Sequence, residues 1–355
     1  MKINNKLFFT RTLLDWNRDL NTRSMPWKGE KDPYKIWLSE IMLQQTRVEQ
    51  GREYYLRFVQ AFPSIRELAA APDDQVFKLW EGLGYYSRCR NLLATARHIS
   101  TELSGIFPST YPEILQLKGV GPYTAAAIAS FGYGLPHGVV DGNVNRVLAR
   151  FFGISTPTDS TEGKKQFFLL AQELLDKKEP ATYNQAIMDF GAIICRPKSP
   201  LCIDCPLNTG CAAFQTGQVE KLPVKAKKPV KKDRWFYYVV VNKNAQYLIR
   251  RRESKDIWQH LYEFILIEQP GRMSMEELLR SKEFRLGLPF ETGSFQVSVE
   301  YRQQLTHQTI HAVFLETTVE DMPVAEGFEA VSRDALTTRA FPRLLNHFLE
   351  DKGWK

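Results

Sequence analysis

Apolar residues recur every three to four positions through most of the first 215 residues. This spacing gathers them on one face of a helix and therefore predicts amphipathic helices. Helical periodicity is clearest in residues 35–50, 88–103, 123–134 and 164–178. Turn sequences such as FPSI, GIFPSTYP and LPHG separate these segments. Residues 1–215 are therefore predicted to form an all-α domain.

The pattern changes after residue 215. Residues 216–233 combine lysines and prolines without periodicity, which predicts a basic linker. Beyond the linker, short runs rich in β-branched and aromatic residues are typical of strands. Strands are expected in 235–244, 245–252, 293–304 and 308–319, and helices in 273–281 and 343–351. Residues 234–355 are therefore predicted to form a second, α+β domain.

Composition and charge narrow the class of protein. Of 355 residues, 43% are hydrophobic and 25% charged, as in folded globular domains, and no apolar run is long enough to cross a bilayer. The N-terminal segment lacks the apolar core of a signal peptide. We therefore expect a soluble, monomeric cytoplasmic protein, nucleoid-associated if bacterial, with no membrane partner. The net charge of +7 favours a polyanionic partner.

Four of the five cysteines fall in one short loop, 195–211, as Cys195-x6-Cys202-x2-Cys205-x5-Cys211. In a reducing compartment this cluster indicates a metal site rather than disulfides. Thiolates bind both zinc and iron–sulfur clusters, but only the central pair has the CxxC spacing common in zinc sites. The looser outer spacings favour a [4Fe–4S] cluster, and zinc or unligated structural thiols are the alternatives. Cys89 stands apart and is predicted to be a buried thiol.

The segment LKGVGPYTAAAIASFG, residues 117–132, predicts two helices joined by a tight turn. Gly119 and Gly121 would allow a sharp turn without a Cβ clash, and Pro122 suits a first helical turn. The amides around Val120 would then face outward at a helix N-terminus, where phosphate binds well. The segment therefore predicts a contact with a DNA backbone, and a plain turn between helices is the alternative.

Two carboxylates are candidates for chemistry. Asp141, in VVDGNVNRV, precedes a predicted helix, so it is either a helix N-cap or an exposed carboxylate at the mouth of a cleft. Glu40 interrupts an apolar helical stripe that contains Ile36 and Leu43. Partial desolvation there would raise its pKa and keep it protonated near neutral pH, as a general acid requires. An ordinary solvated helical glutamate is the alternative.

The hairpin, Asp141 and the four cysteines, in that order, resemble the helix–hairpin–helix DNA glycosylases that carry an iron–sulfur cluster. The resemblance covers most of residues 1–215. It implies two helical lobes with double-stranded DNA in the groove between them, and a [4Fe–4S] cluster that fixes a DNA-facing loop. Tyr123 stands where lyase members carry a Schiff-base lysine, and a phenol cannot form an imine. The chain therefore resembles the monofunctional MutY-type adenine glycosylases.

This resemblance implies the roles of the catalytic residues. SEIMLQQT matches the segment that carries the catalytic glutamate, so Glu40 is expected to protonate adenine as the glycosidic bond breaks. Asp141 is expected to remain ionised and to stabilise the oxocarbenium-like sugar. Tyr123 and Asn143 match positions that pack around these carboxylates and hydrogen-bond to them.

Adenine must leave the duplex to reach these groups, and other residues must occupy the gap. By resemblance, Gln45 and Tyr85 would wedge into the base stack, and Thr46 and Leu83 would lie near the opposite base. Ordinary helix packing is the alternative for all four residues.

Residues 234–355 resemble the Nudix-like recognition domain of MutY-type enzymes. A Nudix hydrolase needs clustered glutamates on a metal-binding helix. Counted from Gly271, Glu277 and Arg285 fit that spacing, but the next expected glutamates are replaced by Leu286, Pro289 and Phe290. We therefore expect no nucleotide hydrolysis, and expect this domain to recognise 8-oxoguanine opposite the adenine.

The loop QLTHQTIH is the expected recognition element. The family commonly has Phe-Ser-His where this chain has Leu305, Thr306 and His307. Thr306 and His307 retain groups for polar contacts, whereas Leu305 lacks an aromatic face. A surface histidine in a turn is the alternative for His307.

The predicted function is excision of adenine from A:8-oxoguanine or A:G mispairs in duplex DNA. An endonuclease III-like glycosylase/lyase and a non-catalytic DNA-damage binding protein are the alternatives. Tyr123 argues against the lyase, and the pair of Glu40 and Asp141 argues against the binding protein.

Overall fold

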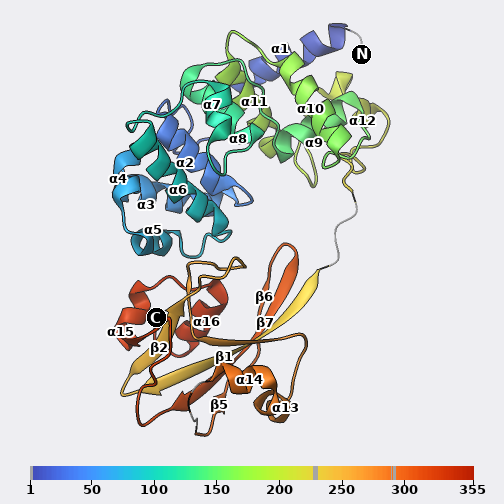
Figure 1. Ribbon diagram of the computed structural model, residues 1–355. Helices are drawn as coiled ribbons and strands as arrows, with labels where there is room; N and C mark the ends of the chain where they lie inside the picture. The colour runs from blue at the N-terminus through green and yellow to red at the C-terminus, as the bar shows by residue number, and fades with distance from the viewer. Residues whose placement is uncertain (1–2, 227–230, 289, 291–292) are drawn as a thin grey trace. The chain divides into compact units, whose positions relative to one another are not determined.

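The computed structural model describes residues 3–226, 231–288, 290 and 293–355. The chain forms two compact units, Met1–Ala70 with Asn91–Lys227 (unit 1) and Ala71–Arg90 with Lys228–Lys355 (unit 2). Unit 1 is helical and unit 2 contains a mixed sheet (Figure 1), so the predicted fold class is confirmed. None of the described helices combines the length and the apolar character needed to span a membrane.

The helices of unit 1 begin where the sequence supplies caps. The side chains of Asp32, Asp141 and Ser160 each accept a hydrogen bond from a first-turn amide. The helices are α1 (Ile3–Asp19), α2 (Pro33–Leu43), α3 (Val48–Ala61), α4 (Ile65–Ala70), α6 (Ser87–Glu102, which begins in unit 2), α7 (Tyr111–Gln116), α8 (Pro122–Tyr133), α9 (Gly142–Phe152), α10 (Thr161–Leu174), α11 (Pro180–Ile193), the 3-10 turn η1 (Asn208–Gly210) and α12 (Ala212–Gln215).

One helical prediction is wrong in part. The periodic segment 35–50 is not continuous, because α2 ends at Leu43 and α3 begins at Val48. Between them Gln45 adopts a positive φ of 58°, a backbone conformation that is uncommon outside glycine. Residues 44–47, QQTR, are all polar, but neither glycine nor proline marks the interruption.

Packing within unit 1 fixes the three helices that carry the candidate catalytic residues. Apolar side chains of α1, α9, α10 and α11 share one core, which includes Phe9, Leu148, Phe167 and Phe190. Helix α11 also packs against α8, and α8 packs against α2. The positions of α2, α8 and α9 are therefore set by a common set of buried contacts.

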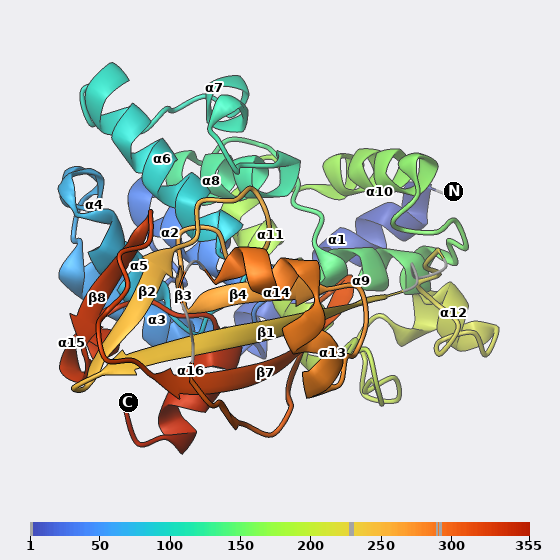
Figure 2. The same cartoon turned by 60° about the horizontal axis from the view of Figure 1, so that its bottom comes forward.

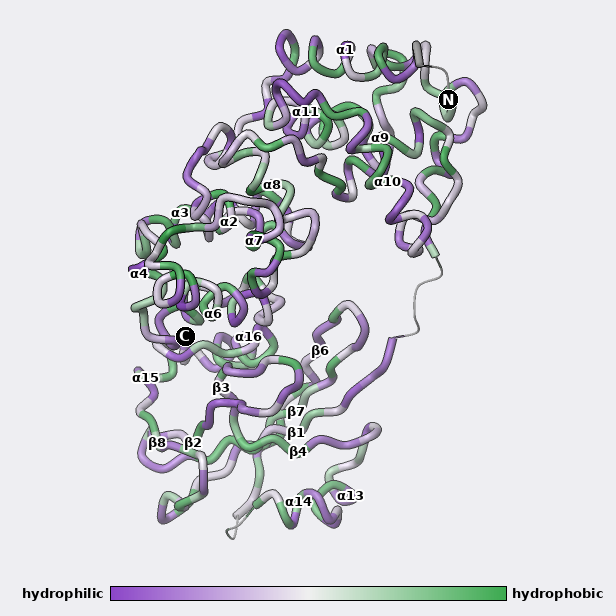
Figure 3. Tube along the Cα trace, turned by 45° about the horizontal axis from the view of Figure 1, so that its top comes forward, coloured by the Kyte–Doolittle hydropathy of each residue, from purple (hydrophilic) through white to green (hydrophobic). Residues whose placement is uncertain are grey.

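The sheet of unit 2 is organised around its two longest strands. β1 pairs in parallel with β7 from Lys232 opposite Gln308 to Asn242 opposite Thr318, and the two lie side by side in Figure 2. β1 begins hydrophilic and becomes hydrophobic where its residues are buried (Figure 3). The strands are β1 (Lys232–Lys243), β2 (Gln246–Arg251), β3 (Tyr262–Glu263), β4 (Ile265–Gln269), β5 (Gln296–Val297), β6 (Tyr301–Gln304), β7 (Gln308–Thr318) and β8 (Phe328–Ser332). The helices of this unit are α5 (Asp73–Trp80), α13 (Met275–Arg280), α14 (Lys282–Gly287), α15 (Arg333–Thr338) and α16 (Arg343–Asp351).

The segment expected to be a linker is partly packed. Leu222 is buried in the core of unit 1, and its carbonyl accepts a hydrogen bond from Arg150 Nε at 3.0 Å. The carbonyl of Val224 accepts from the amide of Thr158 at 3.0 Å. The described residues 216–226 therefore form part of the surface of unit 1.

Candidate active site

Glu40 lies on α2, a helix buried over most of its circumference. Asp32 caps this helix through Tyr34 N at 2.9 Å, and Pro33 occupies its first turn. The Glu40 side chain is 7% exposed among apolar neighbours. Burial raises the pKa of Glu40 to about 7, hydrogen bonding with Tyr123 lowers it, and the charge of Asp141 raises it. Glu40 can therefore hold a proton near neutral pH and release it there.

Asp141 combines both interpretations proposed for it. It is the N-cap of α9, since its Oδ1 accepts from Val144 N at 2.7 Å, and its Oδ2 accepts from Asn143 Nδ2 at 2.8 Å. Its carboxylate also lines a cavity. Burial raises the pKa of Asp141, while the hydrogen bonds from Val144 and Asn143 lower it. The donors favour the ionised form and fix the direction of both oxygens.

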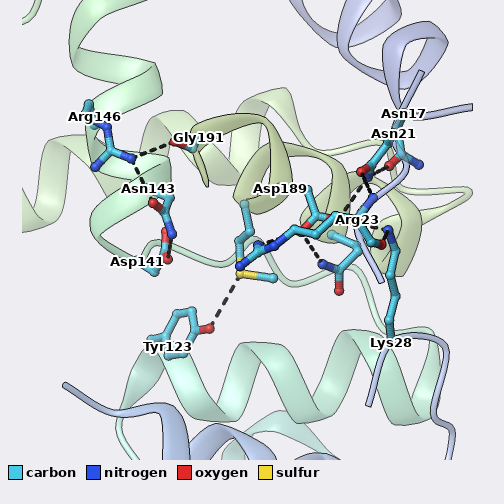
Figure 4. A network of polar contacts seen from close by, with 12 residues as sticks. Asn17, Asn21, Arg23, Lys28, Tyr123, Asp141, Asn143, Arg146, Asp189 and Gly191 are labelled. Atoms are coloured by element: carbon cyan, nitrogen blue, oxygen red, sulfur yellow. Dashed lines mark hydrogen bonds and ion pairs between the residues drawn. The ribbon is translucent and has the colours of Figure 1, made fainter. Parts of the chain in front are cut away.

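Arg146 orients the amide that contacts Asp141 (Figure 4). Its Nη2 donates to Asn143 Oδ1 at 2.8 Å and to the carbonyl of Gly191 at 2.8 Å. Because an arginine has only donors, the Asn143 oxygen must face Arg146, and its Nδ2 must face Asp141. Arg146 Nε also donates to the carbonyl of Cys195 at 2.7 Å. Arg146 and Asn143 therefore connect the cysteine loop to the carboxylate of Asp141.

The predicted catalytic residues meet in one cavity of about 730 Å³. Glu40, Tyr123, Asp141 and Asn143 all line it, although they come from α2, α8 and α9. The Tyr123 hydroxyl oxygen lies 3.5 Å from Met188 Sδ. Gln45 and Thr46, predicted to contact DNA, lie on the same wall. The cavity has the volume of a small-molecule site and can accommodate a nucleobase.

Several lining residues were not anticipated from the sequence. They belong to the irregular segment between α1 and α2 and to α11, and include Arg23, Trp27, Lys28, Gln185 and Met188. The tryptophan followed by a lysine in SMPWKG is the signal that could have drawn attention to the residues between α1 and α2. No periodic pattern marked these residues, because the segment between α1 and α2 is neither helix nor strand.

Behind this wall lies the fully buried carboxylate of Asp189 (Figure 4). Its Oδ1 accepts from Arg23 Nη1 at 2.8 Å and from Gln185 Nε2 at 3.0 Å. Its Oδ2 accepts from Asn21 Nδ2 at 2.9 Å and from Lys28 Nζ at 3.0 Å. One carboxylate on α11 therefore holds the irregular segment that closes the cavity.

The hairpin between α7 and α8 has the predicted form with one correction. Gly119 has a φ of 80°, and a Cβ there would lie 2.8 Å from Asn91 Cβ, so this position needs glycine. Gly121 has a φ of −97° and no atom near its ideal Cβ, so its expected steric role is wrong. Gly121 is instead the N-cap of α8, which begins at Pro122, and Val120 is buried.

The residues expected to wedge into the base stack or to lie near the opposite base differ in exposure. Gln45 and Tyr85 are exposed, and both have positive φ, 58° and 49°. Such backbone conformations are unfavourable for these residue types and often mark functional positions. Leu83 is 4% exposed and packs in the interior, in the manner of the alternative interpretation.

The expected recognition loop is the turn between β6 and β7. Thr306 and His307 are exposed there, while Leu305 is partly covered and its amide donates to Gln308 O at 2.8 Å. The hydroxyl of Thr306 lies 2.8 Å from that of Tyr85, which belongs to the same unit. Two residues expected to approach the base opposite adenine are thus hydrogen-bonded to each other.

Glu277, which fitted the Nudix spacing, has a structural role in α13. Its Oε2 accepts from Ser274 N and from Ser274 Oγ, each at 2.8 Å, and Ser274 Oγ accepts from Glu277 N at 3.3 Å. These bonds lower the pKa of Glu277 and form a capping box. Leu286 is exposed, and Pro289 lies outside the described residues.

The four clustered cysteines surround one small cavity, and none forms a disulfide. Arg150 Nη1 lies 3.4 Å from Cys195 Sγ. Across the described ranges, no three potential ligands converge tightly enough to hold a single metal ion. Four thiols around one cavity are a donor set that suits an iron–sulfur cluster or zinc.

Comparison with known proteins finds a family match for each part of the chain. Residues 38–172 match the HhH-GPD superfamily of base excision DNA repair proteins, and residues 236–351 match the NUDIX domain. An adenine DNA glycosylase of Buchnera aphidicola (subsp. Baizongia pistaciae) is 36% identical over 308 residues, which are 86% of this chain and 84% of that protein. The Homo sapiens adenine DNA glycosylase is 43% identical over 223 residues, 60% of this chain and 41% of that protein.

A solved structure extends the comparison to the fold. A thermostable thymine-DNA glycosylase aligns with a TM-score of 0.56 and 29% sequence identity, over 60% of this chain and 98% of its own. The aligned fraction is comparable to the share of the chain that lies in the helical part. The fold and the relatives together show that the chain belongs to the adenine DNA glycosylases of the HhH-GPD superfamily, enzymes of base excision DNA repair.

Proposed function

We propose that this enzyme removes adenine that is mispaired with 8-oxoguanine or guanine, and that it leaves the DNA backbone intact. The observation that carries the proposal is the burial of Glu40 beside Asp141 and Tyr123 in one cavity of about 730 Å³. Two carboxylates with different surroundings can divide the roles of acid and charge stabiliser.

In the proposed mechanism, adenine is flipped out of the duplex into this cavity. Glu40 donates its proton to N7 as the C1′–N9 bond breaks, so the electron pair of that bond departs with a neutral base. Asp141 carries the negative charge that stabilises the cationic sugar. Water then adds at C1′ and gives up a proton, which completes the hydrolysis.

Tyr123 is proposed to tune Glu40 rather than to react. A hydrogen bond with the phenol lowers the pKa of Glu40 and opposes the effect of burial. The same position cannot supply the amine that strand cleavage through an imine requires. The enzyme is therefore proposed to be monofunctional.

The opposite base is proposed to be recognised by the turn that contains Leu305, Thr306 and His307. Thr306 and His307 are exposed and offer a hydroxyl and an imidazole for polar contacts. Leu305 contributes apolar area without an aromatic face, which favours weaker discrimination between 8-oxoguanine and guanine than an aromatic residue would give.

We propose that Cys195, Cys202, Cys205 and Cys211 hold a [4Fe–4S] cluster. When bound, the cluster would serve as a structural cross-link of the 195–211 loop, with no chemical step assigned to it. The single cavity lined by all four thiols and the neighbouring Arg150 support this assignment.

One gel separates this function from its alternatives. End-labelled duplexes with a single adenine opposite 8-oxoguanine or guanine are incubated with the protein, and each sample is divided before alkali is added. Strand breaks that appear only after alkali are expected for a monofunctional glycosylase. Equal breaks without alkali would identify a lyase, and binding with no breaks in iron-loaded protein would identify a binding protein.

A further inference from the structure

A second cavity, of about 960 Å³, adjoins the catalytic one. Tyr123 and Gly142 line both cavities, so the two share a wall at the N-terminal ends of α8 and α9. The remaining walls come from α9, α10, Pro197 of the cysteine loop and the packed residues 220–225. This second cavity has no role in the mechanism above.

We propose that this cavity, the lysine groove, binds the phosphodiester backbone of the DNA strand that carries the target adenine. The proposal rests on the proposed function, and it adds a strand-binding site next to the base pocket. The groove is defined by Lys164 and Lys165 of α10 and by Lys225.

The charge of the groove fits a polyanion. Five cationic side chains line it, namely Arg146, Arg150, Lys164, Lys165 and Lys225, against the two carboxylates Asp159 and Glu220. One oxygen of Asp159 accepts the amide of Ala226 at 2.9 Å, which holds the chain next to Lys225 in place. The surplus of positive charge supplies the electrostatic term that phosphate binding needs.

The lysines are the cations best placed to contact a ligand. Arg146 and Arg150 donate to main-chain carbonyls and help to organise the cysteine loop. Lys164 and Lys165 are exposed in the first turns of α10, whose N-terminal amides carry positive partial charge. The pKa of Asp159 is lowered mainly by the hydrogen bond from the Ala226 amide and further by the charges of Lys225 and Lys164.

The position and lining of the groove favour a strand over a small anion. A backbone that leaves the base pocket at Gly142 enters the groove directly, because that residue borders both cavities. The aromatic residues Tyr111 and Phe168 line the same groove as the cations. Basic side chains interleaved with aromatic rings are characteristic of surfaces that bind single strands.

The test compares two neighbouring pairs of lysines. Lys164→Ala/Lys165→Ala removes two charges from the groove, and Lys177→Ala/Lys178→Ala removes two exposed charges from the chain after α10 that do not line it. Affinity for an A:8-oxoguanine duplex is measured against salt concentration. The groove variant is expected to lower the slope of log K against log[salt] by about 2, and the control to leave it unchanged.

Single methylphosphonate substitutions then locate the contact on the DNA. Wild-type protein is expected to lose affinity for neutral linkages on one side of the target adenine, and the groove variant to be insensitive to those same linkages. Single-turnover excision at saturating DNA is expected to be the same for the Lys177→Ala/Lys178→Ala control and wild type. Equal salt slopes for the two lysine pairs, or no position-dependent difference, would overturn the proposal.

Two further outcomes distinguish a failure of the strand-binding proposal from a failure of the proposed function. If adenosine diphosphate binds wild type but not the groove variant while the DNA slopes agree, the groove is a nucleotide site and the strand proposal is wrong. If the slopes differ as expected but wild type excises no adenine, the proposed function fails and the groove assignment stands.

Discussion

Asn143 donates Nδ2 to Asp141 Oδ2 at 2.8 Å, so the Asp141 carboxylate is held by a neighbour on the helix that it caps. Asp141 therefore has two separable properties, a capping oxygen and a negative charge. The cap uses Oδ1 and the amide of Val144. An isosteric amide retains the first property and removes the second.

Asp141→Asn is therefore expected to abolish excision without unfolding the protein. Asparagine caps helices as well as aspartate does, but its amide nitrogen would face the Asn143 Nδ2 donor, so the lost hydrogen bond should lower the free energy of unfolding by about 1–3 kcal/mol. Loss of the stabilising charge should slow single-turnover excision roughly 10²–10⁴-fold. Asp32→Asn, the same change at the cap of α2, should leave excision intact. Full activity in Asp141→Asn would show that the charge is unnecessary.

Glu40→Gln is expected to stabilise the fold while it abolishes excision. Burial raises the pKa of Glu40 from 4.5 to about 7, so ionised Glu40 disfavours the folded state. That cost is absent below pH 4.5, grows as pH rises towards 7 and is constant above it, at roughly 3 kcal/mol by linkage. Denaturant unfolding of both proteins at pH 5, 6, 7 and 8 measures the difference. A gap that does not widen with pH would mean that Glu40 is solvated.

Tyr123→Phe is expected to shift the pH dependence of excision. Activity should fall as pH rises through about 7, because Glu40 loses the proton that it donates. Tyr123 lowers the pKa of Glu40 through a hydrogen bond, so its removal should move the alkaline limb to higher pH. Tyr133→Phe, on the same helix but bonded to Phe107 O, should leave the profile in place. A Tyr123→Phe profile that overlays wild type would exclude the tuning role.

The sequence reveals the parts of this site that obey local rules. The N-cap at Asp141, the apolar surroundings of Glu40 and the cysteine spacing each follow from residues close together in the chain. The resemblance to the glycosylase family then supplied the expectation that these features act together. The buried contacts of Asp189 could not be predicted this way, because its partners Arg23 and Lys28 lie more than a hundred residues away in an irregular segment.

The backbone of the turn between α2 and α3 also could not be predicted from the sequence. Gln45 adopts a left-handed conformation although neither glycine nor proline marks the position. The helical patterns on either side favoured one continuous helix, although residues 44–47 are all polar. Tertiary packing decided the backbone there, and the exposed glutamine is the result.

Cys202→Ser is expected to release the iron and to destabilise unit 1. All four thiols line one cavity, so the loss of one ligand breaks the proposed cluster. Cys89→Ala is the control, because Cys89 is fully buried elsewhere. Iron per protein and the thermal melting temperature are measured for both variants. Wild-type iron content in Cys202→Ser would remove Cys202 from the ligand set.

Asp189→Asn is expected to be among the most destabilising conservative changes in the chain. Asp189 is fully buried and neutralises Arg23 and Lys28, whose side chains are only 24% and 27% exposed. Removing the carboxylate leaves two desolvated cations without a counter-charge, which typically costs about 3–5 kcal/mol.

The matched control is Asp15→Asn, which breaks an exposed pair with Arg18 at the same distance of 2.8 Å. Solvent screening limits that loss to less than about 1 kcal/mol. Comparing the denaturant midpoints of the two variants isolates the effect of burial, because both variants lose the same charge and only the surroundings differ. Because Arg23 and Lys28 line the base cavity, Asp189→Asn should also weaken binding of a mismatch duplex. Equal midpoints for the two variants would mean that the buried cluster does not anchor the cavity wall.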